Sequence, residues 1–218
     1  MMRVYNGSDS ELRAAGLADA VASVRRGELV VVHGDGAYVV IADAFSARGT
    51  ARLRALKQRP DMNIPVFVGR QETVDGISPL LGGAGRVART LMQACWPGAL
   101  TVITPTHPTL MWDCTPNGTV AVRMPLHPWT LDVVRAIGPT ATVPVHGHDS
   151  QPCTSVSAAQ GLLSDAVAVY LDGGPCLSDQ MSAVVDATGE RPLLLRPGAF
   201  SAEYLQGLAP ELVVEASS

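Results

Sequence analysis

The chain has 218 residues, of which 47% are hydrophobic and 17% charged, and this balance favours a globular domain with a sizeable core over an intrinsically disordered chain. A formal net charge of −4 argues against binding nucleic acid through bulk charge, although a local basic patch stays open. The chain shows no signal-peptide pattern, and no apolar run approaches the roughly 20 residues of a membrane span, so we expect a cytoplasmic protein without membrane contact.

Hydrophobic periodicity predicts alternating helices and strands. In chain order we expect a helix at 10–26, strands at 29–33 and 37–44, a helix at 47–58, a strand at 64–69, a helix at 85–95, strands at 99–104 and 119–124, a helix at 129–137, a strand at 140–145, a helix at 155–164, strands at 166–172, 182–187 and 192–197, and a helix at 201–207. No repeat or composition break interrupts this series. The pattern indicates a single α/β domain over residues 1–218, with its core at about 10–207, built on an open twisted mixed sheet with flanking helices.

The helix at 47–58 is expected to turn Leu53 and Leu56 inward and its arginines outward. The outward residues would form a basic strip of Arg48, Arg52, Arg54, Lys57 and Arg59. Such a strip is either a solvated helix face or an RNA-binding edge.

Lys57 is the one lysine in a chain with 15 arginines. Arginine and lysine serve equally well on most solvated surfaces, but a lysine ammonium is a compact charge on a flexible stem that suits contact with a phosphate. Lys57 is therefore either a functional residue or a lysine that stands at this position by chance.

Four segments in order resemble motifs of the YrdC-like family, the threonylcarbamoyl-AMP synthases. They are "KQRP" (57–60), "WPGALTVI" (96–103), "VAVRMPLHP" (120–128) and "SAVVDATGERPLLLRPGAFS" (182–201). The resemblance implies a single YrdC-like domain with a concave basic cleft.

The resemblance also implies a reaction. Family members condense L-threonine with bicarbonate to a carbamate, which attacks the α-phosphate of ATP and releases pyrophosphate, and the product serves tRNA modification. Such a nucleotidyltransferase uses ATP as a substrate together with Mg²⁺, and its small-molecule partners are a nucleotide and an amino acid. This chemistry requires cations around the triphosphate.

The family motifs assign roles to particular residues. Lys57 and Arg59 match catalytic positions that hold phosphate and carboxylate groups, and Tyr38 matches the tyrosine at the threonine end of the cleft. Further nucleotide-binding positions are matched by Arg123, Ser182 and Arg196. Without the resemblance, the two arginines would be interpreted as surface ion-pair partners.

Three departures fall within the family's polar motifs. The Pro-Thr-Asp-Thr-x-Tyr-Gly stretch is "HGDGAYV" here (33–39), the Ser-Ala-Asn stretch is "PVH" (144–146), and a threonine is replaced by Ala183. Lost hydroxyl and amide groups predict weakened or altered activity. Two alternatives stay open: a non-catalytic paralogue that binds nucleotide or RNA, and an enzyme that handles another carbamoyl or acyl adenylate.

Histidines enter where these polar groups are lost. We expect substrate binding by His33, Asp35, Tyr38, His146 and His148. With Asp149 and Cys153, the histidines also have the residue types of a divalent-metal site, but no standard ligand spacing is complete, so we expect no protein-bound metal. His107 and His127, in proline-bounded turns, are interpreted as structural.

Overall fold

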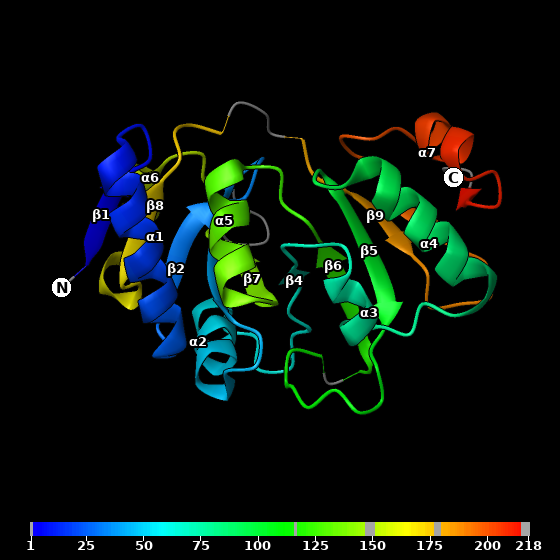
Figure 1. The fold of residues 1–218 in the computed structure, drawn as a ribbon, viewed down its shortest axis with the longest axis horizontal. Helices are drawn as coiled ribbons and strands as arrows, with labels where there is room; N and C mark the ends of the chain where they lie inside the picture. The colour runs from blue at the N-terminus through cyan, green and yellow to red at the C-terminus, as the bar shows by residue number, and fades with distance from the viewer. Residues whose placement is uncertain (1, 116, 147–150, 177–179, 215–218) are drawn as a thin grey trace.

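The computed structural model describes residues 2–115, 117–146, 151–176 and 180–214. These residues form one mixed sheet of eleven strands flanked by helices, in the order β1-β8-β2-β3-β7-β4-β6-β5-β9-β10-β11 (Figure 1). The strands are β1 (Arg3–Asn6), β2 (Val30–His33), β3 (Tyr38–Asp43), β4 (Val66–Phe67), β5 (Leu100–Pro105), β6 (Thr119–Arg123), β7 (Thr140–Pro144), β8 (Val169–Asp172), β9 (Ala183–Asp186), β10 (Leu193–Arg196) and β11 (Val213–Val214). The helices are α1 (Ser10–Arg25), α2 (Ala47–Lys57), α3 (Thr73–Ile77), α4 (Gly82–Cys95), α5 (Pro128–Ile137), α6 (Val156–Leu163) and α7 (Ala202–Leu208), with a 3₁₀ turn at Ser164–Ala166. The predicted α/β domain with an open mixed sheet is confirmed.

The sheet has two parts that meet at β4. Strands β1, β8, β2, β3 and β7 lie on one side of β4, and strands β6, β5, β9, β10 and β11 lie on the other. The short strand β4 pairs antiparallel with β7 and parallel with β6, through two residue pairs on each side. The two-residue strand therefore joins the two parts of the sheet.

The apolar run of β2 is buried on both faces of the sheet. Val30 and Val32 pack in a cluster with side chains from α1 and α5, whereas Val31 belongs to the larger cluster that includes Leu53 of α2. Burial on both faces explains why this strand reads as a continuous apolar run rather than an alternating one. None of the helices formed by the described residues combines the length and apolar character that crossing a membrane requires.

Most predicted elements are present, with shifted ends. The strand expected at 64–69 is reduced to Val66–Phe67, and Pro65, which has no N–H to donate, precedes it. The strand expected at 166–172 begins only at Val169, after the 3₁₀ turn. The patterns missed the short elements β1, α3 and β11.

The outward basic strip expected on α2 does not form one surface. The guanidinium of Arg54 donates to the backbone carbonyl of Asp113 and its side chain is only 12% exposed, while Leu53 points inward as expected. Lys57 is half-buried at the end of α2, whereas Arg48 and Arg59 are exposed. A loop 59 residues away in sequence covers Arg54, and the helical pattern of α2 alone carries no sign of that contact.

Helix α4 begins three residues earlier than expected, and one of its glycines, Gly85, lies against the preceding segment. A Cβ atom at Gly85 would lie 2.1 Å from the carbonyl oxygen of Leu80, whereas one at Gly83 would meet nothing nearer than 3.9 Å. Gly85 therefore has a steric reason to be glycine.

We predict that Gly85→Ala lowers the free energy of unfolding by about 1–3 kcal/mol, because the Leu80 backbone cannot move aside as a side chain could. Urea unfolding measures the change. Gly83→Ala is the matched control on the same helix turn, and it should leave stability unchanged or raise it slightly, since alanine favours helix. Equal effects of the two substitutions would contradict this account of the turn.

Candidate functional site

The sheet register brings several sequence candidates to one set of strand ends. His33, the last residue of β2, pairs with Tyr38, the first residue of β3, and Val39 pairs with Pro144 at the end of β7. Arg123 ends β6, but its register partner Phe67 pairs with Thr140 at the start of β7, so Arg123 reaches this region through its side chain, which bonds to Asp35. Strand pairing therefore gathers His33, Tyr38 and Pro144, and a side-chain contact adds Arg123.

An ion pair between Asp35 and Arg123 lies at the centre of this region. An Nη atom of Arg123 donates to Asp35 at 2.6 Å, and the same carboxylate accepts from the backbone N–H groups of Leu126 at 3.0 Å and His127 at 2.9 Å. The side chains are only 13% and 16% exposed. Asp35 has a left-handed backbone conformation (φ 73°), which aspartate tolerates better than most residues. The expected substrate contact of Asp35 is thus occupied by internal partners.

Arg123 retains donor capacity after these contacts. Its Nε atom donates to the carbonyl of Gly98 at 3.0 Å, in the segment that matches the family's Trp-Pro-Gly motif. A guanidinium has five N–H donors, so donors remain for an anion. Burial lowers the pKa of Arg123, and Asp35 opposes that shift.

Lys57 approaches the same region from the end of α2. Its ammonium donates to the carbonyl of His146, just beyond β7, and burial lowers its pKa. Gln58, in a left-handed conformation, ends the helix and carries Arg59 onto the surface, where its side chain is exposed. The structure therefore brings Lys57, but not Arg59, into contact with the altered segment at 144–146.

The ring of His33 is held by aromatic contacts and by hydrogen bonds to the backbone of Asp35 and Pro175. It stacks on His127 with centroids 4.3 Å apart, and it meets Tyr38 edge-on at 5.3 Å. Its Nδ1 atom accepts the backbone N–H of Asp35 at 3.1 Å, which assigns the proton of the neutral ring to Nε2. Burial lowers the pKa of His33, and the neighbouring His127 lowers it further.

Sequence reasoning placed His127 in a structural turn, but the structure places it in the site. Its Nε2 lies 3.3 Å from the carbonyl oxygen of Gly173, and its Nδ1 is buried without a hydrogen-bond partner among the described residues. The sequence signal was limited to a histidine before the proline that starts α5.

Tyr38 anchors β3 to the segment after β8. Its hydroxyl donates to the carbonyl of Gly174 at 2.6 Å and accepts the N–H of Gly173 at 3.1 Å. Asp172, which sequence reasoning also missed, lies 3.2 Å away. Burial, followed by the charge of Asp172, raises the pKa of Tyr38. The expected substrate contact of this hydroxyl is therefore taken by protein groups.

Ser182 and Arg196 form a second group at the start of β9. The hydroxyl of Ser182 accepts from Thr101 at 2.9 Å, and two nitrogens of Arg196 donate to the carbonyl of Ser182 at 3.0 and 3.2 Å. The next residue, Ala183, bonds through its N–H to Ala99. Since Arg123 bonds to Gly98, residues 98–99 link this group to the Asp35–Arg123 pair.

The expected gathering of three histidines is only partly visible. His33 lies against Asp35, whereas the Nδ1 of His146 lies 3.4 Å from the backbone nitrogen of Cys153, near Lys57. His148 and Asp149 lie outside the described residues. Within the described ranges, no group of three or more His, Cys, Asp and Glu side chains could hold a metal ion.

The exchange of threonine for glycine at position 34 is coupled to position 39. A Cβ atom at Gly34 would lie 2.6 Å from a methyl carbon of Val39 and 2.6 Å from the carbonyl oxygen of Ala37. The family motif has glycine where Val39 stands. The valine side chain therefore occupies space that a side chain at position 34 would need, so the two departures belong to one repacked turn.

Comparison with known proteins identifies the family. The model of the Sua5/YciO/YrdC family, described as "Telomere recombination", matches residues 22–198. The chain belongs to this family. A relative in Mycobacterium tuberculosis H37Rv, whose name gives threonylcarbamoyl-AMP synthase as a provisional function, is 38% identical over 220 residues, covering 100% of this chain and 99% of the relative. The threonylcarbamoyl-AMP synthase of Bacillus subtilis is 31% identical over 202 residues, covering 91% of this chain and 58% of that protein.

Solved structures of the Sua5/YciO/YrdC family share the fold. Pyrococcus abyssi Sua5 complexed with L-threonine superposes with a TM-score of 0.84 at 23% identity, covering 99% of this chain and 62% of that chain. Escherichia coli YciO superposes with a TM-score of 0.78 at 19% identity, covering 94% and 98%. The chain thus spans less than two thirds of the Pyrococcus protein but nearly all of YciO.

We predict that the free energy of unfolding falls as the pH drops from about 7.5 to 5.5, and that His33→Asn reduces this fall. The folded-state pKa of His33 is depressed below the unfolded value of about 6.5, so the unfolded chain binds the proton first and acid favours unfolding. Asparagine keeps an acceptor for the Asp35 N–H but does not titrate. Urea unfolding across this pH range measures the slope.

His107→Asn is the control for that measurement, because His107 bonds to Thr109 outside the site. It should leave the pH dependence as in the parent protein. If His33→Asn behaves like His107→Asn, the buried neutral state of His33 is refuted.

Proposed function

We propose that this chain is a nucleotidyltransferase of the threonylcarbamoyl-AMP synthase type, with an altered amino-acid end of the cleft. The observation that carries the proposal is that Lys57 and Arg123, both on family motifs, reach the end of β7 and the β2–β3 turn, in a chain 31% identical to a named synthase over 91% of its length. ATP would be a substrate, with Mg²⁺ arriving as its counter-ion.

The proposed chemistry needs positive charge rather than covalent help from the protein. A carbamate oxygen forms a bond to the α-phosphorus of ATP while the bond to the bridging oxygen breaks, and pyrophosphate leaves with that bond's electrons. Half-buried Lys57 and the remaining donors of Arg123 would stabilise the charge on the phosphate oxygens, because charges act more strongly where water is excluded. Ser182 and Arg196 are positioned to fix the adjacent strand end around the nucleotide.

The altered residues at the amino-acid end of the cleft support a changed or weaker site for the amino-acid substrate. The hydroxyl of Tyr38 and the carboxylate of Asp35 are both engaged by protein groups, and Ala183 is fully buried where the family has threonine. The ring of His33, a residue only 8% exposed, contacts Tyr38, and half-buried His146 accepts from Lys57 through its carbonyl, so both histidines lie beside these positions. We propose these two histidines as the substrate-facing residues, with His148 as an additional candidate.

A non-catalytic nucleotide- or RNA-binding protein is the second candidate function. The side chains of Asp35, Arg123 and Tyr38 are hydrogen-bonded to other groups of the protein. This favours the second candidate, because such a cleft keeps its structure without converting a substrate. ATP binding without threonine-dependent pyrophosphate release would select this candidate. We propose a cytoplasmic location for either function, since both act on nucleotides.

We predict that Lys57→Met lowers kcat/KM for threonine-dependent pyrophosphate release by about 10- to 100-fold, the loss expected for one bond to a charged group. Arg25→Met, an exposed position on α1, is the control and should leave the rate unchanged. An unchanged rate in Lys57→Met would remove Lys57 from the site. ATP, bicarbonate and threonine are the substrates in this assay.

We further predict that threonine-dependent pyrophosphate release is at least about tenfold slower than that of the Bacillus subtilis relative in the same assay, because buried polar partners for substrate are lost. A panel of other L-amino acids tests whether the site has changed its substrate. Turnover with threonine at about 1 per second or faster would contradict the altered site.

A further inference from the structure

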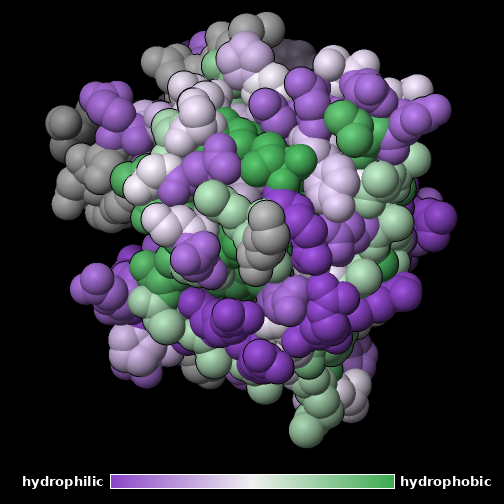
Figure 2. Space-filling model, turned by 90° about the vertical axis from the view of Figure 1, so that its left-hand side faces the viewer, coloured by the Kyte–Doolittle hydropathy of each residue, from purple (hydrophilic) through white to green (hydrophobic). Residues whose placement is uncertain are grey.

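A hollow of about 460 Å³ lies away from the candidate site, between the end of α1, the first turns of α2 and the starts of β1 and β8. Its charged lining consists of Arg3, Arg26, Arg48, Arg52, Glu28 and Asp165. Glu28 precedes β2 and His33 ends it, so the hollow and the site lie about 16 Å apart along the strand. Figure 2 looks onto this side of the molecule, where strongly hydrophilic residues run across the lower half of the face.

The arginines of the hollow are unequally neutralised. Arg26 pairs with Glu28 at 2.9 Å, and Arg3 pairs with Asp19 at 2.7 Å. Neither Arg48 nor Arg52 lies within ion-pair distance of a carboxylate in the part of the chain that the structure describes, and the one lining acid that remains is Asp165. Among the described residues, the hollow therefore presents two guanidinium groups without an ion-pair partner and one lining carboxylate, Asp165, that could offset part of their charge.

Backbone contacts hold these two arginines at the hollow. Arg52 donates to the carbonyl of Gly27 at 3.2 Å, which leaves most of its five donors free for another acceptor. The aliphatic stem of Arg48 lies against Gly27, within 3.1 Å of where a Cβ atom there would stand. Gly27 thus fixes the guanidinium of Arg52 through its carbonyl and lies against the stem of Arg48.

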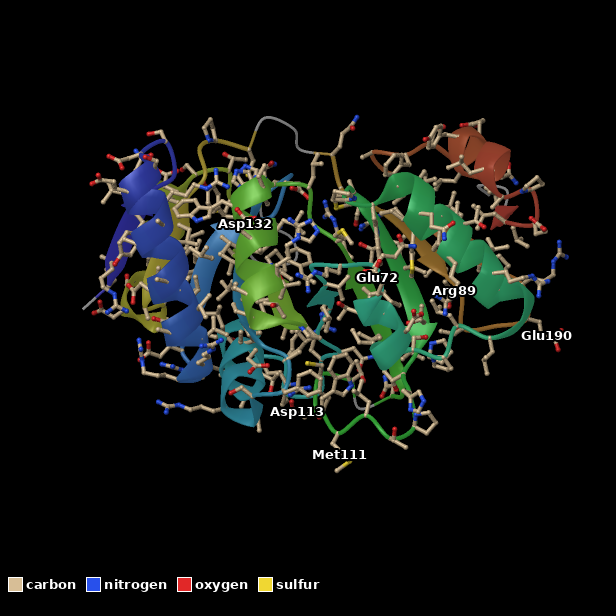
Figure 3. All side chains as sticks on the ribbon, viewed as in Figure 1. Glu72, Arg89, Met111, Asp113, Asp132 and Glu190 are labelled. Carbon is tan, nitrogen blue, oxygen red and sulfur yellow. The ribbon has the colours of Figure 1, made fainter. Side chains whose placement is uncertain are left out.

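A second hollow shows that this charge distribution is specific. It measures about 490 Å³ between α4 and α7, and its charged lining of Arg86, Arg191, Glu190 and Glu211 is balanced. Glu190, labelled at the far right of Figure 3, marks its position at the opposite end of the molecule from β1. Two hollows of similar size therefore differ in charge, and the second provides a matched control.

We propose that the arginine hollow binds a small anion with two or more phosphate groups, at a site separate from the nucleotide cleft. Planar guanidinium forks match phosphate oxygens in pairs, and the volume falls within the range of about 300–1,000 Å³ of small-ligand pockets. The acids Glu28 and Asp165 on the lining oppose a long polyanion lying across the hollow. A compact oligophosphate satisfies both conditions better than an RNA strand.

The test is calorimetric titration with sodium tripolyphosphate. Arg48→Ala/Arg52→Ala should bind at least about tenfold more weakly than the parent protein, while Arg86→Ala/Arg191→Ala should bind as the parent does. Lys57→Met, which alters the cleft, should retain the binding event that depends on Arg48 and Arg52. This result is independent of whether the protein turns over threonine.

Three outcomes overturn the proposal: no binding of tripolyphosphate, equal affinity in the parent and the Arg48→Ala/Arg52→Ala protein, or binding of a 20-nucleotide RNA through these arginines without binding of tripolyphosphate. Thermal unfolding checks that the double variant folds, since Arg52 supports the Gly27 carbonyl. If it does not fold, Arg48→Lys/Arg52→Lys decides, because lysine keeps the charge but not the fork. An affinity loss of at least about threefold in that protein supports the site, and unchanged affinity overturns it.

Discussion

The ion pair between Asp35 and Arg123 is the interaction on which the arrangement of the site depends. Asp35 belongs to the turn between β2 and β3, on one side of β4, and Arg123 ends β6, on the other side. The same carboxylate holds the backbone before α5, and the same guanidinium holds residue 98 before β5. Removing either partner of a buried pair generally costs about 3–5 kcal/mol, because the other charge is left without compensation.

This pair gives the altered family motifs a common physical interpretation. The aspartate of the Pro-Thr-Asp-Thr-x-Tyr-Gly motif, Asp35, and the arginine of the "VAVRMPLHP" segment, Arg123, have been retained, and they connect three chain segments. Around them the two threonines of the motif have become Gly34 and Gly36, Val39 occupies the space beside Gly34, and the ring of His33 stacks on His127. The scaffold of the cleft is thus preserved independently of its substrate contacts, which is why family membership and substrate are separate questions.

The fold could be predicted from sequence largely because its elements are locally encoded. The apolar runs of β2 and β3 and the periodicity of α1 and α5 carry their own signals, and the edge strands β1 and β11 were missed because they are short and partly exposed. The site was less predictable, since its contacts join residues far apart in the chain. Asp35 and Arg123 are 88 positions apart, and neither the engagement of the Tyr38 hydroxyl by Gly174 nor the stacking of His127 leaves a trace in local pattern. Motif resemblance located the participating residues, but it could not show which of them are already bonded to one another.

The brevity of β4 has a mechanical consequence for this molecule. The longest ladder of the sheet has five residue pairs, whereas between its two parts the pairing narrows to Val66 and Phe67. Few hydrogen bonds resist bending where β4 joins the two parts, as also at the two-pair ladders between β2 and β8 and between β10 and β11. The Asp35–Arg123 ion pair connects the two parts of the sheet on either side of β4. An anion that takes the donors of Arg123 from Asp35 would therefore weaken a contact between the two parts of the sheet as well as change the charge of the cleft.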